Sequence, residues 1–110
     1  MPLCDFVAPL NNVSSGGIGS TDVGDVSWVV PTVQARVATC AVGTPFHTWQ
    51  TVAQGKAPAA HKGMVHAAKI MASTACALIN NPKKLNEAKE AFKKHIKRTP
   101  YFCPIPDGVK

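Results

Sequence analysis

The feature that most constrains the fold is a helical pattern in the C-terminal half of the sequence. Apolar residues recur at steps of three and four from Pro58 to about Asn80, which predicts one long helix. The apolar face of this helix is predicted to consist of Met64, Ala68, Met71, Ala75, Leu78 and Ile79. Asn81 and Pro82 break the pattern and begin a second helix, which Pro100 ends. The apolar stripe of the second helix is predicted to be Leu85, Ala88, Phe92 and Ile96.

Two segments before these helices have the composition of strands. Val26–Val30 is β-branched and aromatic, and Gln34–Val42 is apolar on both faces. Strands that are apolar on both faces are typical of a buried α/β sheet, and the alanines of the long helix allow close packing on one. We therefore predict an α/β fold in which few strands pack with two main helices, with a short helix near residues 48–53. Two strands make a poor sheet, so a further strand would come from the opening, from the tail or from chain outside this sequence.

The 110 residues are enough for one domain and too few for two. Residues 1–18 are rich in proline, asparagine, serine and glycine, which predicts an irregular entry segment. Residues 19–110 are predicted to be a single unit that contains the strands, the helices and an extended, proline-rich tail.

Charge and cysteine usage narrow the class of protein. The net charge is +6, and nine basic residues lie between Lys62 and Arg98. This stripe is poor in arginine and aromatic residues, so we expect a solvated lysine face and no nucleic-acid site. No apolar run is long enough for a membrane span or a leader, and the four cysteines form no CxxC pair. We therefore expect a cytoplasmic protein with reduced thiols and no membrane contact.

The segment GSTDVGDVSW, residues 19–28, is the densest candidate for a binding site. Asp22 and Asp25 are three residues apart and are flanked by glycines, immediately before a predicted strand. Glycine allows the backbone to approach a ligand closely, and a carboxylate can bind or orient a metal ligand. The structural alternative is a turn in which the aspartates make only local hydrogen bonds.

The segment GTPFHTW places His47 in a loop after the second predicted strand. Ligands of α/β proteins bind beyond the carboxyl ends of strands, and a neutral imidazole there can bind zinc. The alternative is a structural histidine packed between Phe46 and Trp49. The sequence contains no HExxH, GxSxG or phosphate-binding loop, and therefore no residue is assigned a catalytic role.

Four strings agree in order with one family: GSTDVGDVSWVVPTVQ, GTPFHTWQTVAQG, AAHKGMVHAAK and YFCPIPDGVK. Together they resemble the C-terminal part of the aminobenzoyl-glutamate amidohydrolases, in the aminoacylase and glutamate-carboxypeptidase family of metallopeptidases. The resemblance runs from about residue 19 to the end. It implies an α/β catalytic domain with an inserted lid that mediates dimerisation. It also implies two metal ions, normally zinc, that share a bridging water.

The resemblance implies a metal-ligand role for His47 and a substrate-pocket or ligand-orienting role for the residues around Asp22. The family carries a Glu-Asp pair where this chain has Thr21 and Asp22, so the first acidic position is lost. The implied pocket residues are Thr21, Asp22, Gly24 and Asp25.

The remaining metal ligands, the carboxylate base and the lid would lie outside this chain. We therefore expect zinc or another divalent metal in the full-length enzyme and no tight metal binding by this chain alone, which would be inactive by itself. The expected substrate is a small amide, either aminobenzoyl-glutamate-like or an N-acyl amino acid. The expected partners are the rest of the catalytic domain and a second copy of the enzyme. The alternative is a non-catalytic α/β module that binds a partner or self-associates through an unpaired sheet edge.

Overall fold

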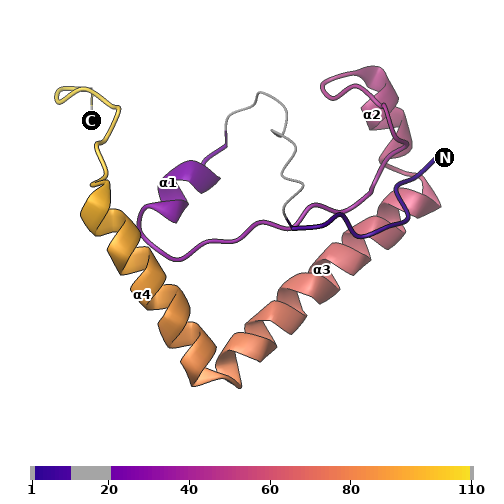
Figure 1. Cartoon of the computed structure of the whole chain (residues 1–110). Coiled ribbons are helices and arrows are strands. Elements are labelled where there is room, and N and C mark those ends of the chain that lie inside the picture. The colour runs from indigo at the N-terminus through magenta and orange to yellow at the C-terminus, as the bar shows by residue number, and fades with distance from the viewer. Residues whose placement is uncertain (1, 11–20, 110) are drawn as a thin grey trace. The chain divides into compact units, whose positions relative to one another are not determined.

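The computed structural model describes residues 2–10 and 21–109, and the regular structure in that part of the chain is helical (Figure 1). The helices are α1 (Val23–Ser27), α2 (Trp49–Gln54), α3 (Pro58–Ile79) and α4 (Pro82–Arg98). The chain divides into two compact units. Residues 1–18 and 34–76 form the first unit, and residues 19–33 and 77–110 form the second. The predicted domain boundary between residues 18 and 19 lies outside the described residues.

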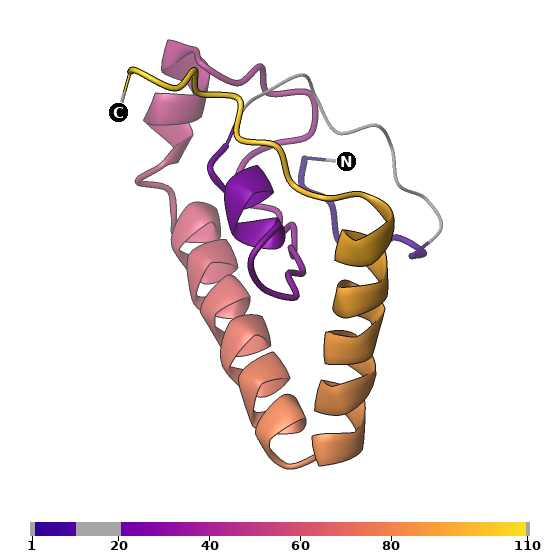
Figure 2. The same ribbon diagram turned by 90° about the vertical axis from the view of Figure 1, so that its left-hand side faces the viewer.

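The two long helices begin and end where the sequence predicts. Figure 2 shows α3 and α4 each as an unbroken helix. The Asn81 side chain caps α4, because its Oδ1 accepts a hydrogen bond of 3.1 Å from the backbone N–H of Lys84. Pro82 follows in the first turn, where its missing N–H costs nothing. The predicted stripe of α4 is also confirmed, because its members are half-buried: Leu85, Ala88, Phe92 and Ile96.

The predicted apolar face of α3 is wrong for five of its six residues, because Leu78 alone among them is half-buried. Met64 and Met71 are 60% and 70% exposed, whereas the buried residues of α3 are Ala60 and Gly63. The chain before α2 crosses α3 so closely that a Cβ at Gly63 would overlap the carbonyl oxygen of Ala38. Only the smallest residues of α3 fit under this crossing. Size therefore decides which residues are buried at the crossing, and both methionines lie mostly in solvent.

The prediction of an α/β fold is wrong, because the described residues contain no strand and no sheet. The first predicted strand, Val26–Val30, instead starts in α1 and continues in turns, where the N–H groups of Val29 and Val30 both donate to the carbonyl of Val26. The second, Gln34–Val42, has no ladder partner in the described chain. Its last residue, Val42, donates its N–H to the carbonyl of Pro2 at 2.9 Å. Strand character needs a paired neighbour, and neither segment has one here.

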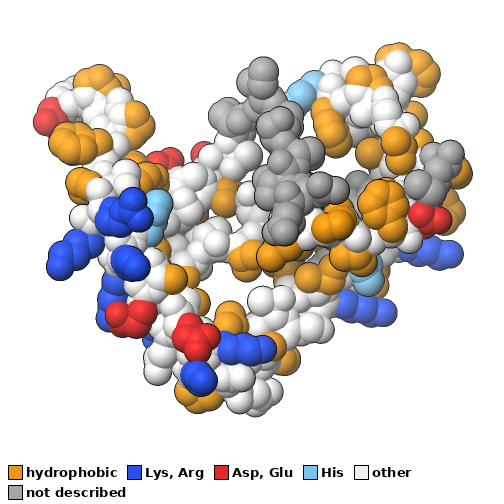
Figure 3. Space-filling model, in the orientation of Figure 1, with side chains coloured by type: hydrophobic (Ala, Val, Ile, Leu, Met, Phe, Trp, Pro, Cys, Tyr) orange, Lys and Arg blue, Asp and Glu red, His pale blue; other side chains and the backbone are white. Residues whose placement is uncertain are grey.

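Little apolar surface is buried in the described residues. Ala60 is the only buried hydrophobic residue among them, at 7% exposure, and large apolar side chains such as Trp49, Val52 and Met71 are mostly exposed. Figure 3 shows hydrophobic side chains on the surface over α2, and lysine and arginine side chains gathered over α4. No helix within residues 2–10 and 21–109 has both the length and the apolar character to cross a membrane.

Replacing Gly63 with alanine tests the close crossing of α3. Alanine normally stabilises a helix by about 1 kcal/mol relative to glycine. We expect Gly63→Ala instead to destabilise the first unit by about 1–3 kcal/mol, because its Cβ would overlap the Ala38 carbonyl and meet the Thr39 side chain. Thermal unfolding followed by circular dichroism measures the change. Gly24→Ala is the matched control, since nothing lies within 4 Å of its added Cβ, and it should leave stability unchanged or raise it.

Candidate functional sites

The first candidate site is the loop around His47, which is held by α2. The side chain of Gln54 accepts a hydrogen bond of 2.8 Å from the N–H of Ala41 and donates one of 3.0 Å to the hydroxyl of Thr44. The hydroxyls of Thr48 and Thr51 both donate to the carbonyl of Pro45, at 2.6 and 2.7 Å. These bonds fix the loop on both sides of Pro45, so α2 acts as its support.

His47 has an unusual backbone conformation within this loop. Its φ is 59°, in the left-handed region that non-glycine residues seldom occupy, and its side chain is exposed. The alternative of a histidine packed between two aromatic rings does not describe this loop. Phe46 and Trp49 are 73% and 75% exposed, so the two rings do not bury the imidazole between them. The imidazole is therefore available to a ligand.

One imidazole does not make a metal site. No group of three or more His, Cys, Asp or Glu residues in the described part of the chain is placed to hold a metal ion. A zinc site needs three or four protein ligands, so the described residues do not form a complete site, and His47 would be one ligand of a larger set.

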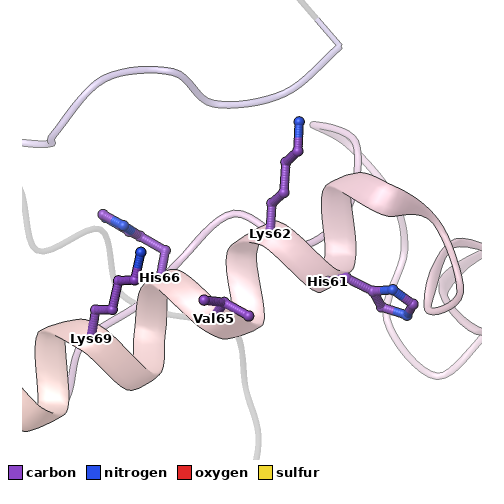
Figure 4. A pocket seen from close by; sticks show the side chains of 5 residues that line it. All are labelled: His61, Lys62, Val65, His66 and Lys69. Atoms are coloured by element: carbon purple, nitrogen blue, oxygen red, sulfur yellow. The ribbon is translucent and has the colours of Figure 1, made fainter.

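The histidines of α3 do not supply the missing ligands. His61 and His66 line a shallow depression of about 350 Å³ on the surface of α3, together with Val65 and two lysines. The two imidazoles point in different directions and Lys62 points away from both of them (Figure 4). Residues five positions apart do not face each other on a helix, which accounts for this divergence. The neighbouring ammonium groups also disfavour a cation at this place.

The second candidate site lies in the other unit, where α1 meets the C-terminal tail. The hydroxyl of Thr21 accepts a hydrogen bond of 3.1 Å from the N–H of Val23, which helps to begin α1. Figure 1 shows α1 beside the C-terminal end of α4, from which the tail emerges. Here the hydroxyl of Tyr101 donates a hydrogen bond of 2.8 Å to Oδ1 of Asp25. This bond joins residues that are 76 positions apart in the sequence.

An aromatic cluster supports this contact. The ring of Trp28 lies 5.6 Å from that of His95 and 5.7 Å from that of Tyr101, with tilts of 32° and 39°. Centroid distances of this size are favourable for aromatic pairs. Trp28 therefore links α1 to both α4 and the tail, and it limits the positions that the Tyr101 hydroxyl can take.

A depression of about 420 Å³ opens beside the Asp25–Tyr101 contact. Of the four residues that the sequence assigns to a substrate pocket, the structure brings Thr21, Gly24 and Asp25 together in its lining. Asp22 directly precedes α1, where its side chain makes no capping hydrogen bond, and it does not line the depression. The rest of the lining comes from residues that sequence reasoning missed: Trp28, Thr99, Pro100, Tyr101, Phe102 and Pro104. His47 belongs to the other unit.

Comparison with known proteins connects the chain with a hydrolase. No protein-family profile and no solved structure matches it. The chain is, however, similar to one component of a hydrolase. That relative is the B subunit of p-aminobenzoyl-glutamate hydrolase from Escherichia coli (strain K12), with 45% identity over 107 residues. The match covers 97% of this chain and 22% of the relative's length. The resemblance to aminobenzoyl-glutamate hydrolases that the sequence motifs predict is thereby confirmed.

The ionisation of Tyr101 reports on the second site. The hydrogen bond to Asp25 raises the pKa of Tyr101 from 10.0 to about 12, with smaller contributions from partial burial and from the charge of Asp25. The folded state raises the pKa of Tyr101. The hydrogen bond to Asp25 therefore contributes fully to the stability of the fold below pH 10, and this contribution is lost as the pH rises through about 12. Tyr101 is the chain's single tyrosine, so its titration is resolved in the ultraviolet spectrum.

We expect Asp25→Asn to lower the pKa of Tyr101 from about 12 towards 10.0, because the charged acceptor is removed. A spectrophotometric titration from near neutral to strongly alkaline pH measures the midpoint directly. Glu87→Gln removes a carboxylate elsewhere in the same unit, and it should leave the midpoint in place. An unchanged midpoint in Asp25→Asn would show that the contact is not formed in solution.

Proposed function

We propose that this chain is part of an amidohydrolase that cleaves an aminobenzoyl-glutamate-like amide or an N-acyl amino acid. The observation that carries the proposal is the depression beside α1. Three of the residues that the sequence indicates as substrate-pocket or ligand-orienting candidates, Thr21, Gly24 and Asp25, line it together. The 45% identity to the E. coli p-aminobenzoyl-glutamate hydrolase component supports the same assignment.

The small number of buried apolar side chains supports an assembly of this chain with further protein. Ala60 is the only buried hydrophobic residue in the described part of the chain, and many large apolar side chains lie exposed. Exposed apolar surface of this extent is typical of protein contact surfaces. We propose that the rest of the catalytic domain covers it, since the relative is much longer than the matched segment. The name of the relative describes one subunit of a hydrolase, so association with another subunit is part of the proposal.

Within that enzyme, we assign His47 as one ligand of zinc or another divalent metal. When bound, such a metal polarises the scissile carbonyl and activates a water molecule. The exposed imidazole and its fixed loop support a ligand role for His47. The described residues offer no complete ligand set, so no catalytic base is assigned to this chain and it is proposed to be inactive alone.

A hybrid enzyme tests the proposal. The 107 matched residues of this chain would replace their counterparts in the E. coli relative, which would be produced together with the other subunit of its enzyme. We expect the hybrid to release p-aminobenzoate from p-aminobenzoyl-glutamate, and the 110-residue chain alone to release none. A hybrid that is folded and inactive, or an isolated chain that is active, would contradict the proposal.

The His47→Ala variant of the hybrid tests the metal ligand. We expect activity to fall by about 100-fold or more, together with a loss of bound metal measured by elemental analysis, because a ligand is removed. His66→Ala is the matched control, since His66 is an exposed histidine on α3 without such a role. If His47→Ala keeps its metal and its activity, His47 is a structural loop residue.

The exposed face of α3 favours a second candidate, in which the chain self-associates. The sheet edge on which this alternative depended is absent from the described residues, but Met64 and Met71 leave an apolar face in solvent. We expect light scattering to show concentration-dependent association of the isolated chain. Met71→Glu should weaken this association, and Lys69→Glu should not. A strict monomer at high concentration would count against this candidate.

A further inference from the structure

The lining of the depression beside α1 has one negative charge and no positive charge. Asp25 is its only ionisable carboxylate, and no lysine or arginine is among its lining residues. Three aromatic side chains, those of Trp28, Tyr101 and Phe102, are among its lining residues. This composition fits a flat, uncharged or cationic aromatic group, and it repels an anion.

The carboxylate of Asp25 keeps capacity for a second donor. Oδ1 accepts the hydrogen bond from Tyr101, and no other donor contacts this side chain in the described part of the chain. An ionised carboxylate has about four acceptor positions on its two oxygens. The side chain of Asp25 is also exposed, so a ligand in the depression can reach it.

We propose that this depression binds the arylamine end of the substrate, with Asp25 accepting a hydrogen bond from the aromatic amine. The inference rests on the proposed function and adds to it the part of the substrate that these residues bind. A substrate that joins an aminobenzoyl group to glutamate has one aromatic, neutral end and one dianionic end. The glutamate carboxylates would be repelled by Asp25 and would find no cation in the lining. The neutral arylamine can donate an N–H hydrogen bond to the carboxylate oxygen of Asp25 that Tyr101 does not occupy.

The neighbouring residues have separate roles in this binding. Tyr101 is a positioning residue, because its hydroxyl fixes one carboxylate oxygen and leaves the other for the ligand. Phe102 is 87% exposed and borders the depression, so its ring is free to stack on a bound aromatic group. Trp28 is half-buried between His95 and Tyr101, so it forms a fixed wall.

The test compares two substrates in the hybrid enzyme, p-aminobenzoyl-glutamate and benzoyl-glutamate, which differ only by the amine. In Asp25→Asn, Tyr101 occupies the one remaining acceptor oxygen and an amide NH₂ replaces the other. We expect the KM for the amine substrate to rise about tenfold, which corresponds to one lost charge-assisted hydrogen bond. The KM for benzoyl-glutamate and the kcat for both substrates should stay within about twofold. Asp5→Asn, the same substitution in the other unit, is the control and should change neither KM.

Three results would overturn the inference: equal changes of KM for both substrates, no change for either, or a change confined to kcat. Tyr101→Phe provides a second test. It keeps the ring and releases the carboxylate, and we expect a smaller, about threefold, rise in KM that is again confined to the amine substrate. An equal rise for both substrates would assign Tyr101 a purely structural role.

A separate measurement decides the case in which the hybrid cleaves neither substrate and the proposed function fails. The 110-residue chain would be titrated with p-aminobenzamide and with benzamide, and binding followed by the NMR signals of the residues around Asp25. Preferential binding of p-aminobenzamide that Asp25→Asn abolishes would support an arylamine site without the hydrolase. Equal binding of the two amides, or no binding of either, would overturn the inference.

Discussion

The shortage of buried apolar side chains is the constraint on which the rest of the structure depends. With Ala60 as the only buried hydrophobic residue in the described chain, no large core holds the segments in place. Side-chain hydrogen bonds take over that function. Gln54 and Thr51 hold the His47 loop, Asn81 begins α4, and Tyr101 ties the tail to α1. Each such bond contributes only about 1 kcal/mol net. These contacts therefore fix the conformation of each unit but add little to its free energy of unfolding.

The two long helices were predictable from the sequence because their signals are local, whereas α1 was missed and part of it was predicted as a strand. Pro58, the Asn81 cap and Pro100 act within one turn of the residue that carries them, and α3 and α4 begin and end accordingly. The two predicted strands are absent from the described residues, because a strand exists only through a paired neighbour and Gln34–Val42 has none there. The buried face of α3 was missed for a different reason. An analysis of apolar periodicity expects methionine to be buried before glycine. At the close backbone crossing, however, only small residues such as Ala60 and Gly63 fit.

The candidate sites divide in the same way. Thr21, Gly24 and Asp25 were found because carboxylates and glycines are dense in one short segment. Tyr101 was missed, because its contact with Asp25 spans 76 positions and no local sequence pattern predicts such a contact. His47 was identified as a loop histidine, but its left-handed backbone and its attachment to α2 through Pro45 required the structure. The sequence thus identified several residues of the candidate sites, and long-range contacts determined how they are arranged.

The same shortage of core links the two candidate sites to the proposed assembly. His47 is exposed with one ligand to offer, and the depression beside α1 has one carboxylate and an exposed aromatic side. An exposed imidazole binds a metal weakly until further ligands surround it, because affinity depends on the complete set. The affinity of an exposed aromatic surface for a ligand likewise rises when neighbouring protein covers it and excludes water. Covering the apolar surface of this chain would therefore stabilise the units and strengthen both sites at once, and folding and binding would be coupled to assembly.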